Sequence, residues 1–201
     1  MVSMTRQMHE MFTMDERHQW LRDADLTYCA ARYLILSDDV FFRPSGGYLL
    51  HLAVEKLFKA IRKVLRPQIR ESQGGHDLKS LHSNLTKMVG SLNRPEAFGA
   101  IEKVMHLKDW RYVDRSSDQS RQTMKDGLRG ADLLVAAGRS AIPSEIRFQG
   151  LCRILQLNGD HRQRLVEALF KKNAKNSYWK KELLGKDQEL DTIIKGCLEN
   201  S

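Results

Sequence analysis

Apolar residues recur at steps of three and four along most of this 201-residue chain, and this periodicity constrains its fold more than any other feature. The clearest case is the segment 48–66, whose apolar positions are Leu50, Val54, Leu57, Ile61, Val64 and Leu65. Such spacing places these side chains on one face of an α-helix, where they can be buried together. Alternation of apolar and polar residues, the mark of a β-strand, does not extend over any useful length. The sequence therefore predicts an all-α protein.

Helix breakers and caps divide the chain into nine predicted helices. These span residues 15–36, 48–66, 76–88, 95–110, 121–138, 145–157, 161–172, 178–184 and 188–198. Asp77 is expected to cap the third of them, since its carboxylate can accept hydrogen bonds from free backbone amides of the first turn. Residues 37–47 are predicted to form a loop, because Pro44 and the pair Gly46-Gly47 disfavour a helix. Within this loop, Phe41 and Phe42 are expected to turn inward.

The best candidate for a domain boundary is the sequence Ile142-Pro143-Ser144. Proline disfavours helix in the residue before it, and Ser144 can cap a new helix. We therefore expect a leader over residues 1–14, a helical bundle over 15–142 and a small basic helical appendage over 143–201.

Charge and composition narrow the classes of partner. The chain has 33 Lys and Arg against 25 Asp and Glu, a net charge of +8, which favours nucleic acid, nucleotides or an acidic protein surface as the partner.

The three cysteines, Cys29, Cys152 and Cys197, form no Cys-x-x-Cys pair, so we expect neither a disulfide framework nor a metal site. The expected location is therefore a reducing cytoplasm. The longest apolar stretch, residues 30–36, carries Arg32 and falls far short of the roughly 20 residues of a membrane helix. We expect no membrane association and no cofactor.

Two basic features are candidates for contacts with an anionic partner. Along the second helix, basic residues follow one another at steps of three, four and three, as Lys56, Lys59, Lys63 and Arg66. Such a stripe could follow a phosphate backbone or bind an acidic protein, and a solvated helix face explains it equally well.

The second basic feature lies in the segment 171–181, which contains five lysines and no acidic residue. Its lysines are Lys171, Lys172, Lys175, Lys180 and Lys181, and its adjacent aromatic residues are Tyr178 and Trp179. This composition suits phosphate contacts combined with base stacking. The alternative is that Trp179 belongs to the core of a small helix.

The sequence of residues 47–60, GYLLHLAVEKLFKA, followed by Gly75-His76-Asp77-Leu78 and Leu81, resembles the HEPN family. That family shares a second helix of the pattern Y-x-x-H-x-A-x-E-K-x-x-K-A and a third that begins H-D-L-x-x-L. Trp110-Arg111-Tyr112 and the helix containing Ala131-Asp132 are similar to its later elements. The resemblance covers about residues 20–140 and implies a bundle of four to five helices. It does not extend to residues 144–201.

The resemblance also implies a range of activities. HEPN proteins include metal-independent ribonucleases, nucleotide-binding modules paired with nucleotidyltransferases, and members without catalysis. The catalytic members carry an Arg followed after four to six residues by a His, which together deprotonate the ribose 2′-hydroxyl and stabilise charge on phosphorus. In this chain Arg111 lies in the corresponding region, but the next histidine is His161. Arg70 and His76 have the required spacing but lie before the third helix.

Three functions follow as hypotheses. The first is a HEPN-like protein of a prokaryotic defence or toxin–antitoxin module that binds RNA or a nucleotide without cleaving it, through the two basic features together with Arg111 and Tyr112. The second is a ribonuclease acting as a homodimer, with Arg111 or the pair Arg70 and His76 as catalytic residues. The third is an adaptor that binds an acidic protein. For the first, a homodimer and a nucleotidyltransferase partner are expected from the resemblance.

Overall fold

The computed structural model describes residues 16–37, 42–66, 77–109, 118–147, 159–185 and 188–199, and every regular element within these ranges is a helix. The helices are α2 (Glu16–Leu36), α3 (Arg43–Leu65), α4 (Leu78–Thr86), α5 (Pro95–Met105), α6 (Asp118–Ser140), α7 (Ser144–Arg147), α9 (Gly159–Phe170), α10 (Asn176–Leu183) and α11 (Gln188–Glu199). The prediction of an all-α fold is confirmed. Within the described ranges, none of the helices combines the length and apolarity needed to cross a bilayer.

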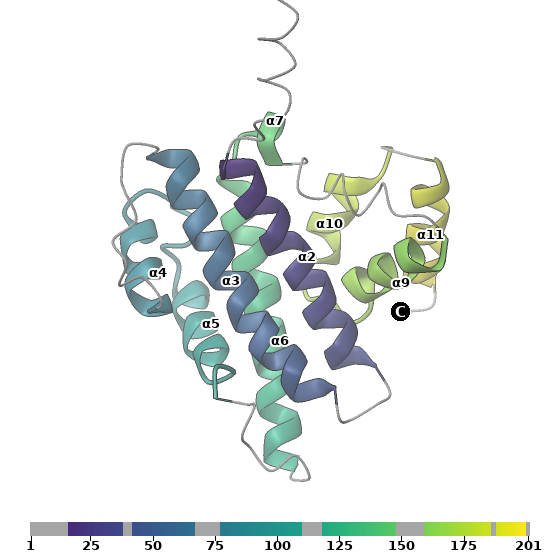
Figure 1. Cartoon of the computed structure of the whole chain (residues 1–201), viewed down its shortest axis with the longest axis horizontal. Coiled ribbons are helices and arrows are strands. Elements are labelled where there is room, and N and C mark those ends of the chain that lie inside the picture. Colours follow the sequence, from purple (N-terminus) through teal and green to yellow (C-terminus); the bar gives the residue numbers. More distant parts are fainter. Residues whose placement is uncertain are drawn as a thin grey trace, which may run out of the picture.

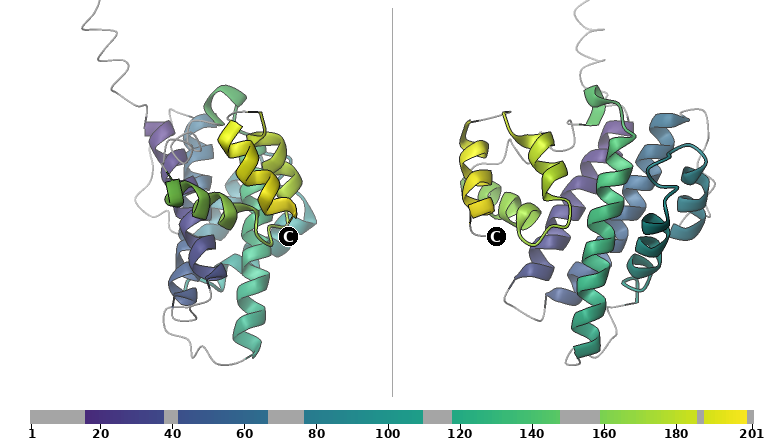
Figure 2. Two further views of the ribbon diagram at one scale, coloured as in Figure 1. Left: turned by 90° about the vertical axis from the view of Figure 1, so that its right-hand side faces the viewer. Right: turned by 180° about the vertical axis from the view of Figure 1, so that it is seen from behind.

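The long helices α2, α3 and α6 form the centre of the molecule (Figure 1). Helices α2 and α3 run antiparallel side by side, and α6 crosses behind them, as the view from the back shows (Figure 2). On one side, α4 and α5 cover α3 and α6. On the other side, α9, α10 and α11 form a second group of helices beside α2.

Both groups of helices contribute to one hydrophobic core. Buried residues of the bundle, such as Leu21 and Leu57, belong to the same cluster as residues of the C-terminal helices. The C-terminal members of that cluster are Val166, Leu169, Phe170, Trp179, Leu183, Leu190 and Ile194. The segment expected to be a small basic appendage is therefore packed against the bundle through shared apolar side chains.

Helix α3 begins at Arg43, so the prediction of a loop over residues 37–47 is wrong for its last residues. Pro44 lies in the first turn, where the missing amide hydrogen of proline removes no helical hydrogen bond. Gly46 is needed for close packing on α2, because a Cβ atom at this position would lie 2.7 Å from Ile35 Cγ1. Phe42 is 51% exposed, so its expected inward orientation is also wrong. Phe41 lies outside the described residues.

Of the other predicted boundaries, one is confirmed, one is shifted and one lies partly outside the described residues. Asp77 caps α4 as expected, and its carboxylate accepts hydrogen bonds from the backbone amides of Lys79 and Ser80, both at 3.2 Å. Helix α6 starts at Asp118, earlier than the predicted residue 121. Of the helix expected over 145–157, the structure describes only the short α7, and residues 148–158 lie outside the described ranges.

The packing of α3 on α2 gives a first prediction. Gly46→Ala should lower the free energy of unfolding by about 1–3 kcal/mol, because the added methyl group would overlap Ile35 and lie 3.0 Å from the carbonyl oxygen of Ala31. The matched control is Gly99→Ala in the exposed face of α5, where an added Cβ meets no atom within 4 Å. That substitution should stabilise the protein by about 0.5–1 kcal/mol, since alanine is the better helix former. Urea unfolding measures the change in the free energy of unfolding for both variants. Equal changes would contradict this account of Gly46.

Candidate nucleic-acid interface

The basic row on α3 is engaged in packing rather than exposed as a continuous stripe. Lys56 Nζ donates a hydrogen bond to Thr27 Oγ1 at 3.2 Å. Lys59 is buried and pairs with Glu55 at 2.7 Å. Lys63 Nζ lies 5.2 Å from the centre of the Trp20 ring, a favourable cation–π distance. Only the fourth member of the row, Arg66, is exposed. The prediction of a phosphate contact is therefore wrong for Lys59. Lys56 and Lys63 contact side chains of α2.

The basic segment, residues 171–181, has a different environment. It comprises the turn between α9 and α10 and most of α10. Lys171, Lys172, Lys180 and Lys181 are exposed, and Lys175 is half-buried. The segment has no acidic residue, so its five lysines have no counter-charge within it.

The aromatic pair of this segment faces the core. Trp179 is 0% exposed and stacks on Tyr28 of α2, with ring centres 6.0 Å apart. Tyr178 is half-buried, and its ring lies edge-on to that of Trp179. Burial raises the pKa of the Tyr178 hydroxyl to about 12, although the positive charge of Arg139 lowers it. The expectation that Trp179 stacks on a base is wrong, since no face of its indole is open to one. Its alternative assignment to the core is correct.

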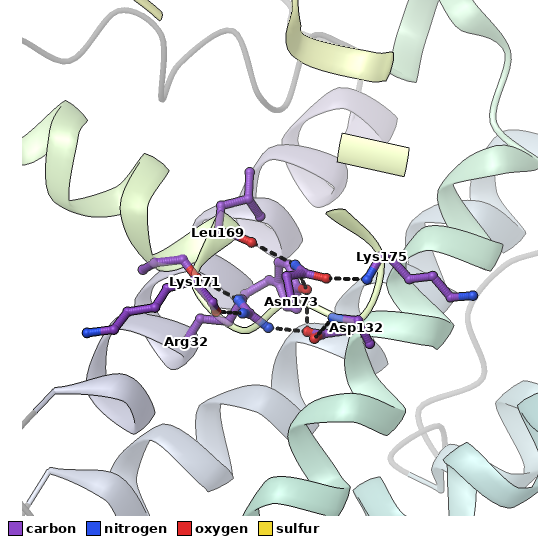
Figure 3. Close-up of polar contacts among 9 residues, drawn as sticks. Arg32, Asp132, Leu169, Lys171, Asn173 and Lys175 are labelled. Atoms are coloured by element: carbon purple, nitrogen blue, oxygen red, sulfur yellow. Dashed lines mark hydrogen bonds and ion pairs between the residues drawn. The ribbon is translucent and has the colours of Figure 1, made fainter. Parts of the chain in front are cut away.

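Buried side chains of the bundle hold the backbone of the basic segment in place (Figure 3). Arg32 on α2 is fully buried, and its Nε donates to the carbonyl oxygen of Ala168 at 2.7 Å. One terminal nitrogen of Arg32 donates to the carbonyl oxygen of Lys171 at 2.5 Å. The last carbonyl groups of a helix lack hydrogen-bond donors within the helix. At the end of α9, the buried guanidinium of Arg32 donates the missing hydrogen bonds.

Asp132 on α6 completes this arrangement. It is 0% exposed and forms an ion pair with Arg32. Its carboxylate also accepts hydrogen bonds from the Tyr28 hydroxyl at 2.7 Å and from the backbone amide of Ala174 at 3.1 Å. Burial, together with the neighbouring Asp132 charge, raises the pKa of Tyr28 well above its usual value, so Tyr28 remains a donor. Every charge in this group therefore has a polar partner.

Asn173 links the same groups from within the turn. Its side-chain amide nitrogen donates to the carbonyl oxygen of Leu169 at 2.7 Å and to the Tyr28 hydroxyl at 3.2 Å. Its side-chain oxygen accepts a hydrogen bond from the backbone amide of Lys175 at 2.8 Å. We refer to Tyr28, Arg32, Asp132 and Asn173 as the clamp, because together they bind the backbone of residues 168–175.

The clamp holds the turn in a conformation that lysine rarely adopts. Lys172 has a φ of 52°, in the left-handed region that favours glycine. This residue follows the end of α9 closely, where glycine usually reverses the chain. The left-handed conformation costs a non-glycine residue about 1 kcal/mol or more. A lysine is thus placed at a strained position while its side chain is exposed.

A second buried ion pair secures α10. Arg139 of α6 and Asp25 of α2 are both buried and paired, and the Arg139 guanidinium lies over the Trp179 ring at 5.5 Å. Nearby, Arg147 of α7 pairs with Glu182 of α10 at 3.3 Å. The basic segment is therefore anchored at both of its ends.

The remaining candidate residues are placed as follows. Arg70, His76, Arg111 and Tyr112 lie outside the described residues, so their roles stay predictions. Cys29 is buried, and this burial raises the pKa of its thiol to about 12, which makes it a poor nucleophile.

Sequence reasoning missed the clamp as a unit, although one signal pointed to it. Arg32 interrupts the longest apolar stretch of the chain, and a charge on an apolar helix face needs a buried partner. That partner, Asp132, lies 100 residues away. Asp132 also belongs to the helix whose sequence is similar to a later element of HEPN proteins.

Comparisons of the chain with known proteins found no matching family model, no matching curated protein and no matching solved structure. The resemblance to HEPN proteins therefore rests on the motifs of the sequence alone.

The clamp gives a second prediction. Asp132→Asn should destabilise the protein by about 3–5 kcal/mol, because it leaves the buried charge of Arg32 without its counter-charge. The matched control is Glu102→Gln, which breaks the ion pair to Lys79 at 2.9 Å between side chains that are 53% and 55% exposed. Solvent screens this exposed pair, so its loss should cost less than about 1 kcal/mol. Chemical denaturation measures the free energy of unfolding of both variants. A loss for Asp132→Asn as small as that for Glu102→Gln would contradict the role of the clamp.

Proposed function

We propose that this protein binds RNA, or a nucleotide, through the basic segment at residues 171–181. The observation that carries the proposal is that a buried clamp holds the backbone beneath lysines whose side chains are exposed or, at Lys175, half-buried. Arg32 binds the carbonyl of Lys171, and Asn173 binds the amide of Lys175. The clamp thus fixes the points from which these two side chains leave the surface.

A fixed backbone matters for binding an anion. Lysines on a rigid turn lose less freedom when they bind than lysines on a loose loop, so more of the interaction energy remains as affinity. Neutralising phosphates with several lysines also releases counterions, which makes the affinity fall steeply with salt. The five lysines and the absence of acid between them support a phosphate-rich partner.

The HEPN resemblance supports the same class of partner. It favours a role in a prokaryotic defence or toxin–antitoxin module in the cytoplasm, with the chain acting as a homodimer and beside a partner such as a nucleotidyltransferase. Because no His follows Arg111 at the spacing of catalytic members, we propose binding without cleavage.

The proposal predicts a defined salt dependence. Lys172→Gly combined with Lys181→Gln should weaken the binding of a labelled RNA and lower the slope of log affinity against log salt by about two, because each lysine that neutralises a phosphate adds about one to that slope. Lys172→Gly suits this test because glycine adopts the φ of 52° without strain, so the fold should persist. The control is Lys87→Gln with Lys103→Gln, which removes the same charge from exposed positions near α4 and on α5. Fluorescence anisotropy in EDTA measures both, and equal slopes in the two variants would overturn the proposal.

The same samples test the other hypotheses. Products ending in a 2′,3′-cyclic phosphate, formed in EDTA and lost on Arg111→Ala with His76→Ala, would establish a ribonuclease instead. Absence of any RNA or nucleotide binding at low salt would favour the adaptor that binds an acidic protein.

A further inference from the structure

We infer that the RNA bound by the basic segment is double-helical rather than single-stranded. The inference rests on the proposed function and names its class of substrate. Its basis is the contrast between the aromatic side chains of the segment, which pack in or against the core, and its lysines, two of which diverge from the turn.

The buried aromatic residues argue against a single strand. Proteins that bind single strands without sequence preference combine a basic groove with aromatic faces on which successive bases stack. Tyr178 and Trp179 are the two aromatic residues of the segment. Trp179 is 0% exposed and contacts both the Tyr28 ring and the Arg139 guanidinium, and Tyr178 packs edge-on against it. Trp179 therefore offers no open stacking face, and Tyr178 is half-buried, so unpaired bases would gain little stacking here.

The directions of the lysines argue against a compact ligand. In Figure 3, Lys171 and Lys175 leave the turn on opposite sides of the clamp, and their ammonium groups point away from each other. A single phosphate or a mononucleotide is best held by charges that converge on it. The clamp binds the backbone of both residues, at the Lys171 carbonyl and the Lys175 amide, so the turn cannot easily reorganise to bring them together.

Diverging charges on a rigid turn instead fit a partner with two rows of phosphates. A double helix presents one row on each side of a groove, and a turn lying over the groove could contact both. Double-stranded RNA is recognised mainly by its shape and through its phosphates and 2′-hydroxyls, which needs no stacking. Lys180 and Lys181 are exposed at successive positions of α10, about 100° apart around the helix axis, and so extend the spread of charge beyond the turn.

The test compares a labelled RNA duplex of about 16 base pairs, the span of a typical double-strand-binding domain, with one of its strands alone. The strand should have no self-complementary sequence, and the buffer should contain EDTA. We expect the duplex to bind the wild-type protein about tenfold or more tightly, a difference that anisotropy titrations resolve readily. Lys171→Gln with Lys175→Gln should reduce this preference, because each substitution removes one of the two diverging charges. Lys87→Gln with Lys103→Gln should leave it unchanged.

The outcomes separate this inference from the proposed function. If the single strand binds as tightly as the duplex, the inference is wrong while RNA binding by the protein stands. If neither RNA binds at low salt, the inference and RNA binding are both wrong, and a titration with a mononucleotide then tests what remains of the proposed function. If the duplex is preferred but the preference survives Lys171→Gln with Lys175→Gln, the double helix binds elsewhere, and the assignment to this segment is overturned. Thermal unfolding of each variant checks that its fold is retained.

Discussion

The buried ion pair between Arg32 and Asp132 is the interaction on which the described structure most depends. It joins α2 to α6, and through the carbonyl and amide groups that it binds it also fixes the turn between α9 and α10. Removing two charges from water costs several kcal/mol per ion, and their attraction offsets this only when further hydrogen bonds satisfy both groups. Here Tyr28 and the backbone of the turn supply those bonds. Helices far apart in the sequence are thereby held in one arrangement.

The basic segment has two faces in different environments. Its inner face is part of the core, where Trp179 is among the largest fully buried side chains. Its outer face carries the lysines. A composition of lysines and aromatics looks like a nucleic-acid motif in the sequence, yet in the structure Trp179 belongs to the core. This division removes the Trp179 ring from the surface, and it is the reason why the proposed partner is one bound through its phosphates.

The sequence predicted what depends on neighbouring residues. The helical periodicity of the chain gave the fold class, and the cap at Asp77 followed from the ability of its carboxylate to accept from amides two and three residues on. The early start of α3 was missed because glycine and proline act as breakers in isolation. In the folded protein, Pro44 lies in the first turn and Gly46 allows close contact with Ile35. Tertiary packing thus reversed a local preference.

The candidate site was only half predictable for the same reason. The five lysines are visible in the sequence, but their support is not, because Asn173 meets Tyr28 across 145 residues and Arg32 meets Lys171 across 139. On α3, the row of basic residues was indistinguishable from a free stripe until Trp20 and Glu55 were seen to contact it. Charge patterns show which residues could bind an anion, whereas burial shows which of them are accessible to one.

The most direct test of the central claim, that the clamp immobilises the basic turn, is amide hydrogen exchange at Ala174 and Lys175 measured by NMR. Both residues lie at or near the surface, and their amides donate to Asp132 and Asn173 rather than to a helical carbonyl. We expect exchange as slow as in the neighbouring helices α9 and α10, since opening would require breaking the buried network. Exchange at the rate of an unprotected loop would contradict the claim that the clamp holds the turn.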